Sequence, residues 1–419
     1  MEKDYLLTHE FISKRWKDGI LENKEGEYTL PFPFEPPCID GLFKCLFYWD
    51  TYYTNKGLIL DGYLEVAKNN VDNLIYLLKK YGCVPNSNSW PGIKHNSQPP
   101  YLHFMVKDIY EVIRDKEWLR DAYEALKIEY KFWMEKRMTP IGLNRYFHHE
   151  KTEQECIDFY DYVTTRLNID KNAPREVKIK QGSAYNACAE GGLDFSPRYN
   201  IEGDEICPVD LNCLLYAMEG NLAEWAREFE PQMEIKFLNA QSKRKDLINK
   251  YLFAKELGIY FDYNFVKGKI EQTDFYFTGQ FMPYIVGLSK DKDGCLKVLS
   301  NLEFKYGIAS TSPYKADVVY QAAFPFSWPY DNGIAFWALS TMNLKAECLR
   351  IGKKYLSLCS NSYLKAGHLW ETYNAIVDEV ANKKEYPNKE MMGWTAGIYE
   401  WIFEYIKRNE KWWRRFLSF

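Results

Sequence analysis

The sequence predicts a mainly α-helical protein. Apolar residues recur at steps of three or four along much of the 419-residue chain, which is the spacing of a helix with one buried face. Alternating patterns typical of strands are few and short, and no linker-like stretch divides the chain. Hydrophobic residues make up 46% of the sequence, which is enough for a sizeable core. We therefore expect one large helical domain over residues 1–419.

The same spacing predicts the individual helices in order. The stretch 58–81 carries apolar residues at helical steps, and Gly82 follows it as a C-terminal stop. Similar stripes predict helices over 117–136, 210–228, 241–257, 334–357 and 392–407. Residues 147–180 are polar and weakly periodic. We interpret this region as a flap or an insertion.

Composition excludes several classes of function. The net charge is -4 and no basic stripe is present, so a nucleic-acid partner is not expected. No apolar run approaches the roughly 20 residues of a membrane span, and the N-terminus lacks the apolar segment of a signal peptide. The ten cysteines show no zinc-like spacing. These features predict a cytoplasmic protein that contacts no membrane.

Unusual residues gather in four loops that mix aromatic with polar side chains. Such loops on a helical scaffold are candidates for a shared binding cleft, although turns need the same Asn, Asp, Gly and Pro residues for their geometry. The four loops span 30–37, 84–100, 191–198 and 327–333.

Carboxylates in these aromatic surroundings are the best candidates for chemistry. No phosphate loop, serine nucleophile elbow or HExxH motif occurs, and His148-His149-Glu150 has no common zinc spacing. Asp50, Asp194 and Glu371 each stand beside aromatic residues. Cleavage of a glycosidic bond needs two carboxyl groups, and an apolar neighbourhood favours the protonated form that a general acid requires. Each carboxylate taken alone also fits a helix cap or a surface position.

Short blocks in a fixed order resemble the trehalase-like clan of glycosidases, glycoside hydrolase families 37 and 63. They cover most of the chain: Leu30–Phe34, Phe47–Thr54, Pro85-Asn86, Ser97–Pro100, Asn144–Tyr146, Glu190–Tyr199, Pro208–Asn212, Trp370–Asn374 and Gly393–Thr395. The resemblance implies an (α/α)6 barrel with a funnel-shaped active site at one end. It also implies hydrolysis with inversion, without a metal or other cofactor.

The resemblance assigns roles by matching position. Asp194 becomes the general acid and Glu371 the general base. The subsite for the non-reducing sugar is expected to contain Trp49, Asp50, Asn88, Gln98 and Arg198. Tyr53, Trp328, Trp370 and Trp394 are further expected sugar contacts.

Departures from the trehalase pattern bear on the substrate. Leu42, Cys45, Ser89 and Asn96 stand where trehalases carry charged residues, three of them arginines. The compact chain resembles the short family 63 enzymes that act on mannosylglycerate or glucosylglycerate. We therefore expect a small α-glucoside or α-mannoside to be a better substrate than trehalose, with Lys44, His95 or Arg166 available to hold a negatively charged aglycone. A trehalase and a non-hydrolytic sugar-binding protein or epimerase of the same fold are the alternatives.

Overall fold

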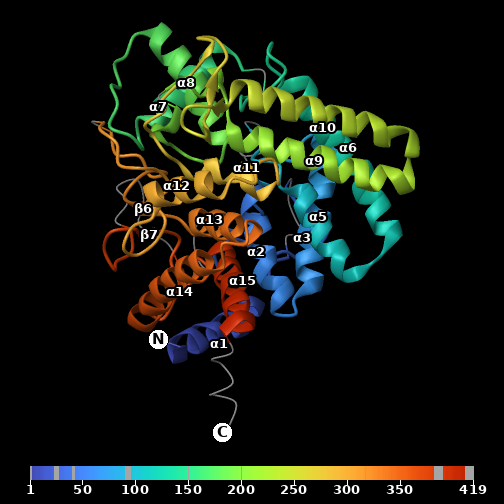
Figure 1. Cartoon of the computed structure of the whole chain (residues 1–419), viewed down its shortest axis with the longest axis vertical. Coiled ribbons are helices and arrows are strands. Elements are labelled where there is room, and N and C mark those ends of the chain that lie inside the picture. Colours follow the sequence, from blue (N-terminus) through green and yellow to red (C-terminus); the bar gives the residue numbers. More distant parts are fainter. Residues whose placement is uncertain are drawn as a thin grey trace.

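The computed structural model describes residues 2–22, 28–39, 43–89, 96–149, 151–199, 201–316, 318–381 and 390–410. Helices dominate these ranges and alternate between an inner and an outer ring (Figure 1). The inner ring closes on itself, because each of its helices contacts the next and the last contacts the first. Its members are α2 (Tyr48–Leu60), α5 (Leu102–Ile113), α9 (Val209–Phe229), α11 (Met282–Ile285), α13 (Pro329–Thr341) and α15 (Gly393–Glu410).

The outer helices stand beside inner ones in chain order. They are α1 (Glu2–Gly19), α3 (Leu64–Tyr81), α6 (Lys116–Lys136), α10 (Pro231–Tyr251), α12 (Lys292–Leu302) and α14 (Lys345–Ala366). Burial distinguishes the two rings: α2 is buried nearly all round, whereas α10 buries only Phe237, Arg244 and Ile248. This arrangement is the expected (α/α)6 barrel. Across the described ranges, no helix combines the length and the apolar character needed to cross a membrane.

Two more helices, α7 (Glu153–Val163) and α8 (Arg175–Glu190), interrupt this alternation between α6 and α9 and pack against each other. Thr152 begins α7 with a capping box that includes Glu155. The polar region 147–180 therefore contains all of α7 and the start of α8. Its weak periodicity reflects the small buried face of α7, which contains only Cys156, Tyr160 and Val163.

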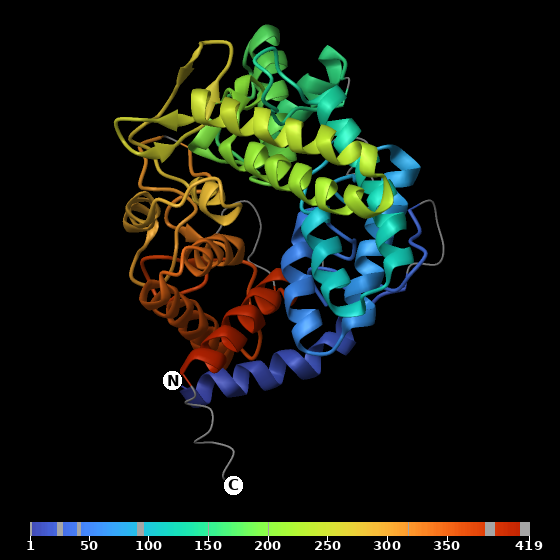
Figure 2. The ribbon, with the colours of Figure 1, turned by 45° about the vertical axis from the view of Figure 1, so that its right-hand side comes forward.

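The strands are two residues long, as the sequence predicted. After α10 come β2 (Phe253–Ala254), β3 (Ile259–Tyr260), β4 (Tyr263–Asn264) and β5 (Lys269–Ile270), which Figure 2 shows projecting from the end of that helix. β1 (Ile206–Cys207) pairs with β4, and β4 pairs with β5, both antiparallel. The pair that matters for the site is β6 (Phe326–Ser327) with β7 (Tyr373–Asn374), also antiparallel.

Several predicted helix boundaries differ from the structure. Gly82 ends α3 in the left-handed conformation with φ 76°, as expected. However, the stripe 58–81 spans two helices, because the chain turns at Gly62 with φ 87°. The stripe 334–357 is likewise divided between α13 and α14 at Asn343, whose φ is 53°. Hydrophobic periodicity does not reveal such breaks when apolar residues continue through the turn.

Candidate active site

A pocket opens where the N-terminal ends of the inner helices converge. It encloses about 660 Å³ including its mouth, which is within the range of small-molecule sites. Trp49 and Asp50 come from the first turn of α2, Tyr330 from that of α13 and Trp394 from that of α15. The remaining lining residues precede these helices or α5 and α9: Pro37, Phe43, Phe47, Asn86, Gln98, Gly192, Asp194, Gln321, Ala322, Trp328, Glu371 and Met391.

Aromatic rings form the wall of the pocket. The ring centroid of Tyr330 lies 4.8 Å from Trp49, 5.5 Å from Trp394 and 6.0 Å from Trp328. Two buried polar atoms of this wall have no hydrogen-bond partner in the described structure, namely Nε1 of Trp394 and Oε1 of Gln321. Buried polar atoms are normally paired, so these two are exceptions among the residues that line the pocket.

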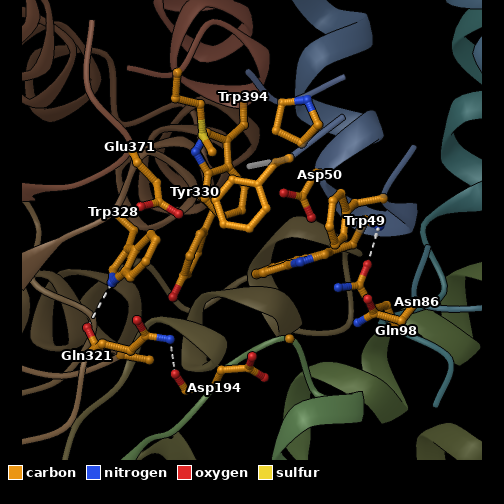
Figure 3. Close-up of a pocket in the computed structure, with 16 residues that line it drawn as sticks. Trp49, Asp50, Asn86, Gln98, Asp194, Gln321, Trp328, Tyr330, Glu371 and Trp394 are labelled. Carbon is orange, nitrogen blue, oxygen red and sulfur yellow. Dashed lines mark hydrogen bonds between the residues drawn. The ribbon is translucent and has the colours of Figure 1, made fainter. Parts of the chain in front are cut away.

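Three carboxylates reach the pocket. Figure 3 shows Asp50 and Glu371 at the top of the view and Asp194 at the bottom, with the rings of Trp49 and Tyr330 between them. Burial raises the pKa of Asp50 from 3.8 to about 7, and the negative charges of Glu371 and Asp194 add to this rise. Asp50 is therefore close enough to Glu371 and Asp194 for their negative charges to disfavour its ionisation.

Glu371 belongs to a loop that is tied to its surroundings. Its side chain is 3% exposed. The pairing of Ser327 with Tyr373 joins this loop to the strand that precedes Trp328. The loop is thus held beside the N-terminus of α13, and the carboxylate is presented from a fixed backbone.

Asp194 lies in the loop that follows α8. Gly192 in this loop has φ 72°, and a Cβ atom there would lie 2.8 Å from the ring of Trp49. Gln321 donates a hydrogen bond from Nε2 to the carbonyl oxygen of Asp194. The Asp194 side chain is 42% exposed, and Nη1 of Arg166 lies 3.0 Å from its Oδ2. The cation beside Asp194 is thus Arg166, which follows α7.

Glu190 anchors the start of this loop. It is fully buried, and burial by itself would raise its pKa, but the adjacent Arg137 guanidinium lowers it below the ordinary value. Both Nε and Nη2 of Arg137 lie 2.6 Å from its carboxylate oxygens. Glu190 also accepts from the backbone N–H of Ser97, the residue before Gln98. One buried ion pair therefore fixes two walls of the pocket.

Of the predicted sugar contacts, Trp49, Asp50, Gln98, Trp328 and Trp394 line the pocket with Asp194 and Glu371. Gln98 also accepts, at 3.1 Å, the backbone N–H of Trp49. The remaining four predicted contacts lie outside the lining of this pocket.

Arg198 and Asn88 are committed to buried structural contacts. The Arg198 guanidinium is 2.7 Å from carboxylate oxygens of both Asp210 and Asp262. Arg198 was expected in the sugar subsite, but these two carboxylates hold its guanidinium elsewhere. Asn88 accepts the backbone N–H of Leu46 at 2.7 Å and donates to the carbonyl of Tyr28.

Tyr53 and Trp370 also lie outside the pocket lining. Tyr53 is fully buried behind Trp49, and its hydroxyl donates to that of Tyr101. Trp370 lines a separate cavity with Tyr373 and Val380, and its ring lies 4.3 Å from that of His368. Adjacent residues of an extended loop point to opposite sides, which separates Trp370 from the pocket that Glu371 lines.

Sequence reasoning missed several lining residues. Asn86 belongs to the Pro85-Asn86 block but was given no role, and nothing marked Tyr330 above its neighbours in the 327–333 loop. Gln321 carries no local signal, and Arg166 was considered only as a cation for an aglycone. Leu42, Trp90, His95 and Glu150 lie outside the described residues.

A second, larger chamber adjoins the pocket. It encloses about 1530 Å³ including its mouth and shares Phe43, Phe47, Asn86 and Asp194 with the first. Helix α7 and the residues beside it form much of its wall. Its other lining residues are Ser87, Ser89, Asn96, Lys151, Glu155, Asp158, Phe159, Tyr162, Arg166 and Ala189.

Potential metal ligands lie elsewhere. Within the described ranges, the grouping of three such side chains is His9, Asp61 and Glu400, whose candidate ligand atoms all lie within 4.8 Å of one another. Nδ1 of His9 is 2.6 Å from Oε2 of Glu400. None of these three residues lines the pocket or the adjoining chamber.

Comparison with known proteins identifies relatives over nearly the whole chain. The family model described as trehalase matches residues 18–407. Trehalase of Bombyx mori is 24% identical over 433 residues, covering 95% of this chain and 72% of the relative. Trehalase of Apis mellifera is 24% identical over 430 residues, covering 92% of this chain and 66% of the relative.

Solved structures share the fold. Neutral trehalase of Saccharomyces cerevisiae aligns over 96% of this chain and 80% of its own, with a TM-score of 0.74 and 20% identity. The family 63 mannosylglycerate hydrolase of Thermus thermophilus, in complex with glucose, aligns over 94% of this chain and 99% of its own. Its TM-score is 0.62 and its identity 14%. Both branches of the clan therefore resemble this barrel.

Proposed function

The chain belongs to the trehalase family and is a glycoside hydrolase, and from this premise we propose that it is an inverting α-glycosidase acting on a small α-glucoside or α-mannoside. The observation that carries this proposal is the presence of Asp194 and Glu371 in the lining of one aromatic pocket. The family premise favours a trehalase as the alternative, since the matching family model bears that description.

The two carboxyl groups have different roles in the proposed reaction, one as general acid and one as general base. Asp194 in its acid form gives its proton to the glycosidic oxygen as the bond to the anomeric carbon breaks. Glu371 as carboxylate takes a proton from the water that attacks that carbon from the opposite face. The buried position of Glu371 suits a base that must hold one water in a fixed orientation. Inversion requires the two groups to be about 6.5–9.5 Å apart, so that this water fits.

The inner pocket is the proposed site for the sugar that is transferred to water. Its aromatic wall can pack against the apolar face of a pyranose ring. Asp50 supplies an acceptor at the start of α2, and Gln98, whose Oε1 accepts the N–H of Trp49, supplies its Nε2 as a donor. In this proposal Asp50 binds hydroxyl groups and takes no part in proton transfer.

The organisation of the chain follows from the same proposal. We infer one catalytic domain over residues 1–419, with α7 and α8 as an insertion that extends the barrel. No disulfide joins cysteines among the described residues, which supports the expectation of a reducing, cytoplasmic compartment. Fractionation of cells that produce the protein would test this placement.

The stereochemistry of the product tests the proposed function. Purified protein would be mixed with an α-glucoside or α-mannoside, and the anomeric protons of the released hexose would be followed by NMR from the first minute. Inversion predicts that the β-anomer appears first. Initial appearance of the α-anomer would indicate retention, and absence of any released hexose across a panel of α-glycosides would contradict the assignment.

A further inference from the structure

We propose that Arg166 and the face of α7 form the subsite for a sugar leaving group, and that Arg166 exchanges its bond to Asp194 for one to that sugar. This inference rests on the proposed function, because it takes Asp194 as the general acid. It narrows the substrate class to α-linked disaccharides or longer saccharides. It also names a positioning residue for the acid.

The first step in the argument is the position of Arg166. Its Nη1 lies 3.0 Å from Oδ2 of Asp194, and its Nη2 donates to the Asp194 carbonyl oxygen at 3.3 Å. The guanidinium carbon lies 5.2 Å from the ring centroid of Phe195 and 5.8 Å from that of Tyr162. Only 13% of the Arg166 side chain is exposed. Aromatic contacts and the turn after α7 therefore place the cation beside the carboxylate.

The second step is a conflict between this ion pair and acid catalysis. Arg166 occupies Oδ2 of Asp194, and the same carboxyl group must contact the glycosidic oxygen when the bond breaks. The bond to Arg166 must therefore be released when substrate binds. Once Asp194 has given up its proton it is a carboxylate again, and the returning cation stabilises that charge. Arg166 thereby acts through Asp194, as a positioning residue.

The third step is the chemistry of the adjoining chamber. Asp194 lines both cavities, so a bond held at Asp194 would place one sugar in the inner pocket and the leaving group in the outer chamber. The chamber is the larger of the two cavities. It therefore has room for a leaving group of at least one sugar.

Its lining suits a sugar. Phe159 and Tyr162 of α7, with Phe43 and Phe47, offer aromatic faces. The lining also contains amides and hydroxyls, the carboxylates of Glu155 and Asp158, and the cations Lys151 and Arg166. Mixed donors and acceptors fit the hydroxyl groups of a neutral sugar better than a single negative charge.

Arg166 also supplies a cation to the region where arginines of the trehalase pattern are substituted. Ser89 and Asn96 stand at two of the substituted arginine positions, and both line the chamber. Asn96 is committed to the carbonyl oxygen of Asn186 at 3.0 Å, and Ser89 contacts Ser87. Arg166 brings a cation to the same chamber from a different segment.

The test compares two substrates of the full-length protein. A glycosyl fluoride of the preferred sugar has a leaving group of one atom, which needs neither the outer chamber nor strong acid assistance. An α-linked disaccharide needs both. The variant is Arg166→Gln, with Arg166→Lys as the conservative form. Arg175→Gln is the matched control, because Arg175 pairs with Glu153 of α7 at the surface and lines neither cavity.

Arg166→Gln is expected to lower kcat/KM for the disaccharide by about 10- to 100-fold, the effect of one lost charge-assisted hydrogen bond. The loss on the fluoride should be much smaller than the loss on the disaccharide, Arg166→Lys should recover part of the disaccharide activity, and Arg175→Gln should match wild type on both substrates. Equal losses on both substrates, or none on the disaccharide, would overturn the inference. A wild-type protein that hydrolyses neither substrate would instead overturn the proposed function itself.

Discussion

The hydroxyl of Thr395 donates a hydrogen bond of 2.9 Å to the backbone carbonyl of Trp370. Thr395 is fully buried in the first turn of α15, directly after the pocket residue Trp394. Trp370 directly precedes Glu371. This bond therefore fixes the Glu371 loop relative to the aromatic wall, in addition to the pairing of β6 with β7.

Thr395→Val removes this bond while keeping the shape of the side chain. We expect the free energy of unfolding to fall by roughly 0.5–1.5 kcal/mol, the net contribution of a typical hydrogen bond, because this partly buried bond is lost. We also expect kcat to fall more than KM rises, since Glu371 would lose its fixed position. Thermal unfolding and steady-state kinetics measure the two effects. Unchanged kcat in a destabilised variant would show that the bond serves folding alone.

Asp194→Asn should lower kcat by at least about 100-fold with little change in folding, as expected for loss of a positioned acid. Glu371→Gln should behave likewise, because the attacking water loses its base. The double variant should lose little more than either single one. Circular dichroism would establish folding and hexose release would give the rates. A folded Asp194→Asn protein of nearly full activity would make Asp194 structural.

Asp50 should contribute to the pH dependence of stability. Its pKa in the folded protein is about 7, against an ordinary value of 3.8. The folded state therefore holds the proton more tightly, and this stabilisation is full below about pH 4 and is lost as the pH rises through 7. Unfolding temperatures at pH 5 and pH 8 should accordingly differ less in Asp50→Asn than in wild type. Equal differences in the two proteins would exclude this linkage.

Activity should survive exhaustive chelation. The residues that line the pocket hold no set of metal ligands within the described structure, and His9, Asp61 and Glu400 lie away from it. Turnover would be measured after dialysis against EDTA, before and after adding a divalent cation. Loss that the cation restores would mean that a metal takes part and that the two-carboxylate mechanism is incomplete.

A substrate panel should rank disaccharides above glycerates. The sequence alone favoured a small aglycone over trehalose, because three arginine positions are substituted. The size of the outer chamber, its aromatic wall and Arg166 favour a sugar instead. We expect kcat/KM for kojibiose or trehalose to exceed that for glucosylglycerate and mannosylglycerate. The opposite order would favour a small aglycone as the leaving group and would contradict a sugar subsite in the chamber.

The sequence by itself determined the helical class, the central span of several helices and the segments that hold the candidate site. Helical periodicity is a local property, because each buried face is written into residues three and four apart. The blocks around Trp49, Asp194, Glu371 and Trp394 were found because their order resembles that of the trehalase-like glycosidases, and they lie at the starts of helices or in adjacent loops.

Only the tertiary structure decided which side chains of those segments face the pocket. Asn86 lines it while Asn88 binds Leu46 and Tyr28, and Arg166 reaches Asp194 while the nearer Arg198 is held by Asp210 and Asp262. These choices depend on partners far away in sequence, which closure of the helical ring brings together. No local pattern records such pairings, because they are set by charge and space shared between distant segments.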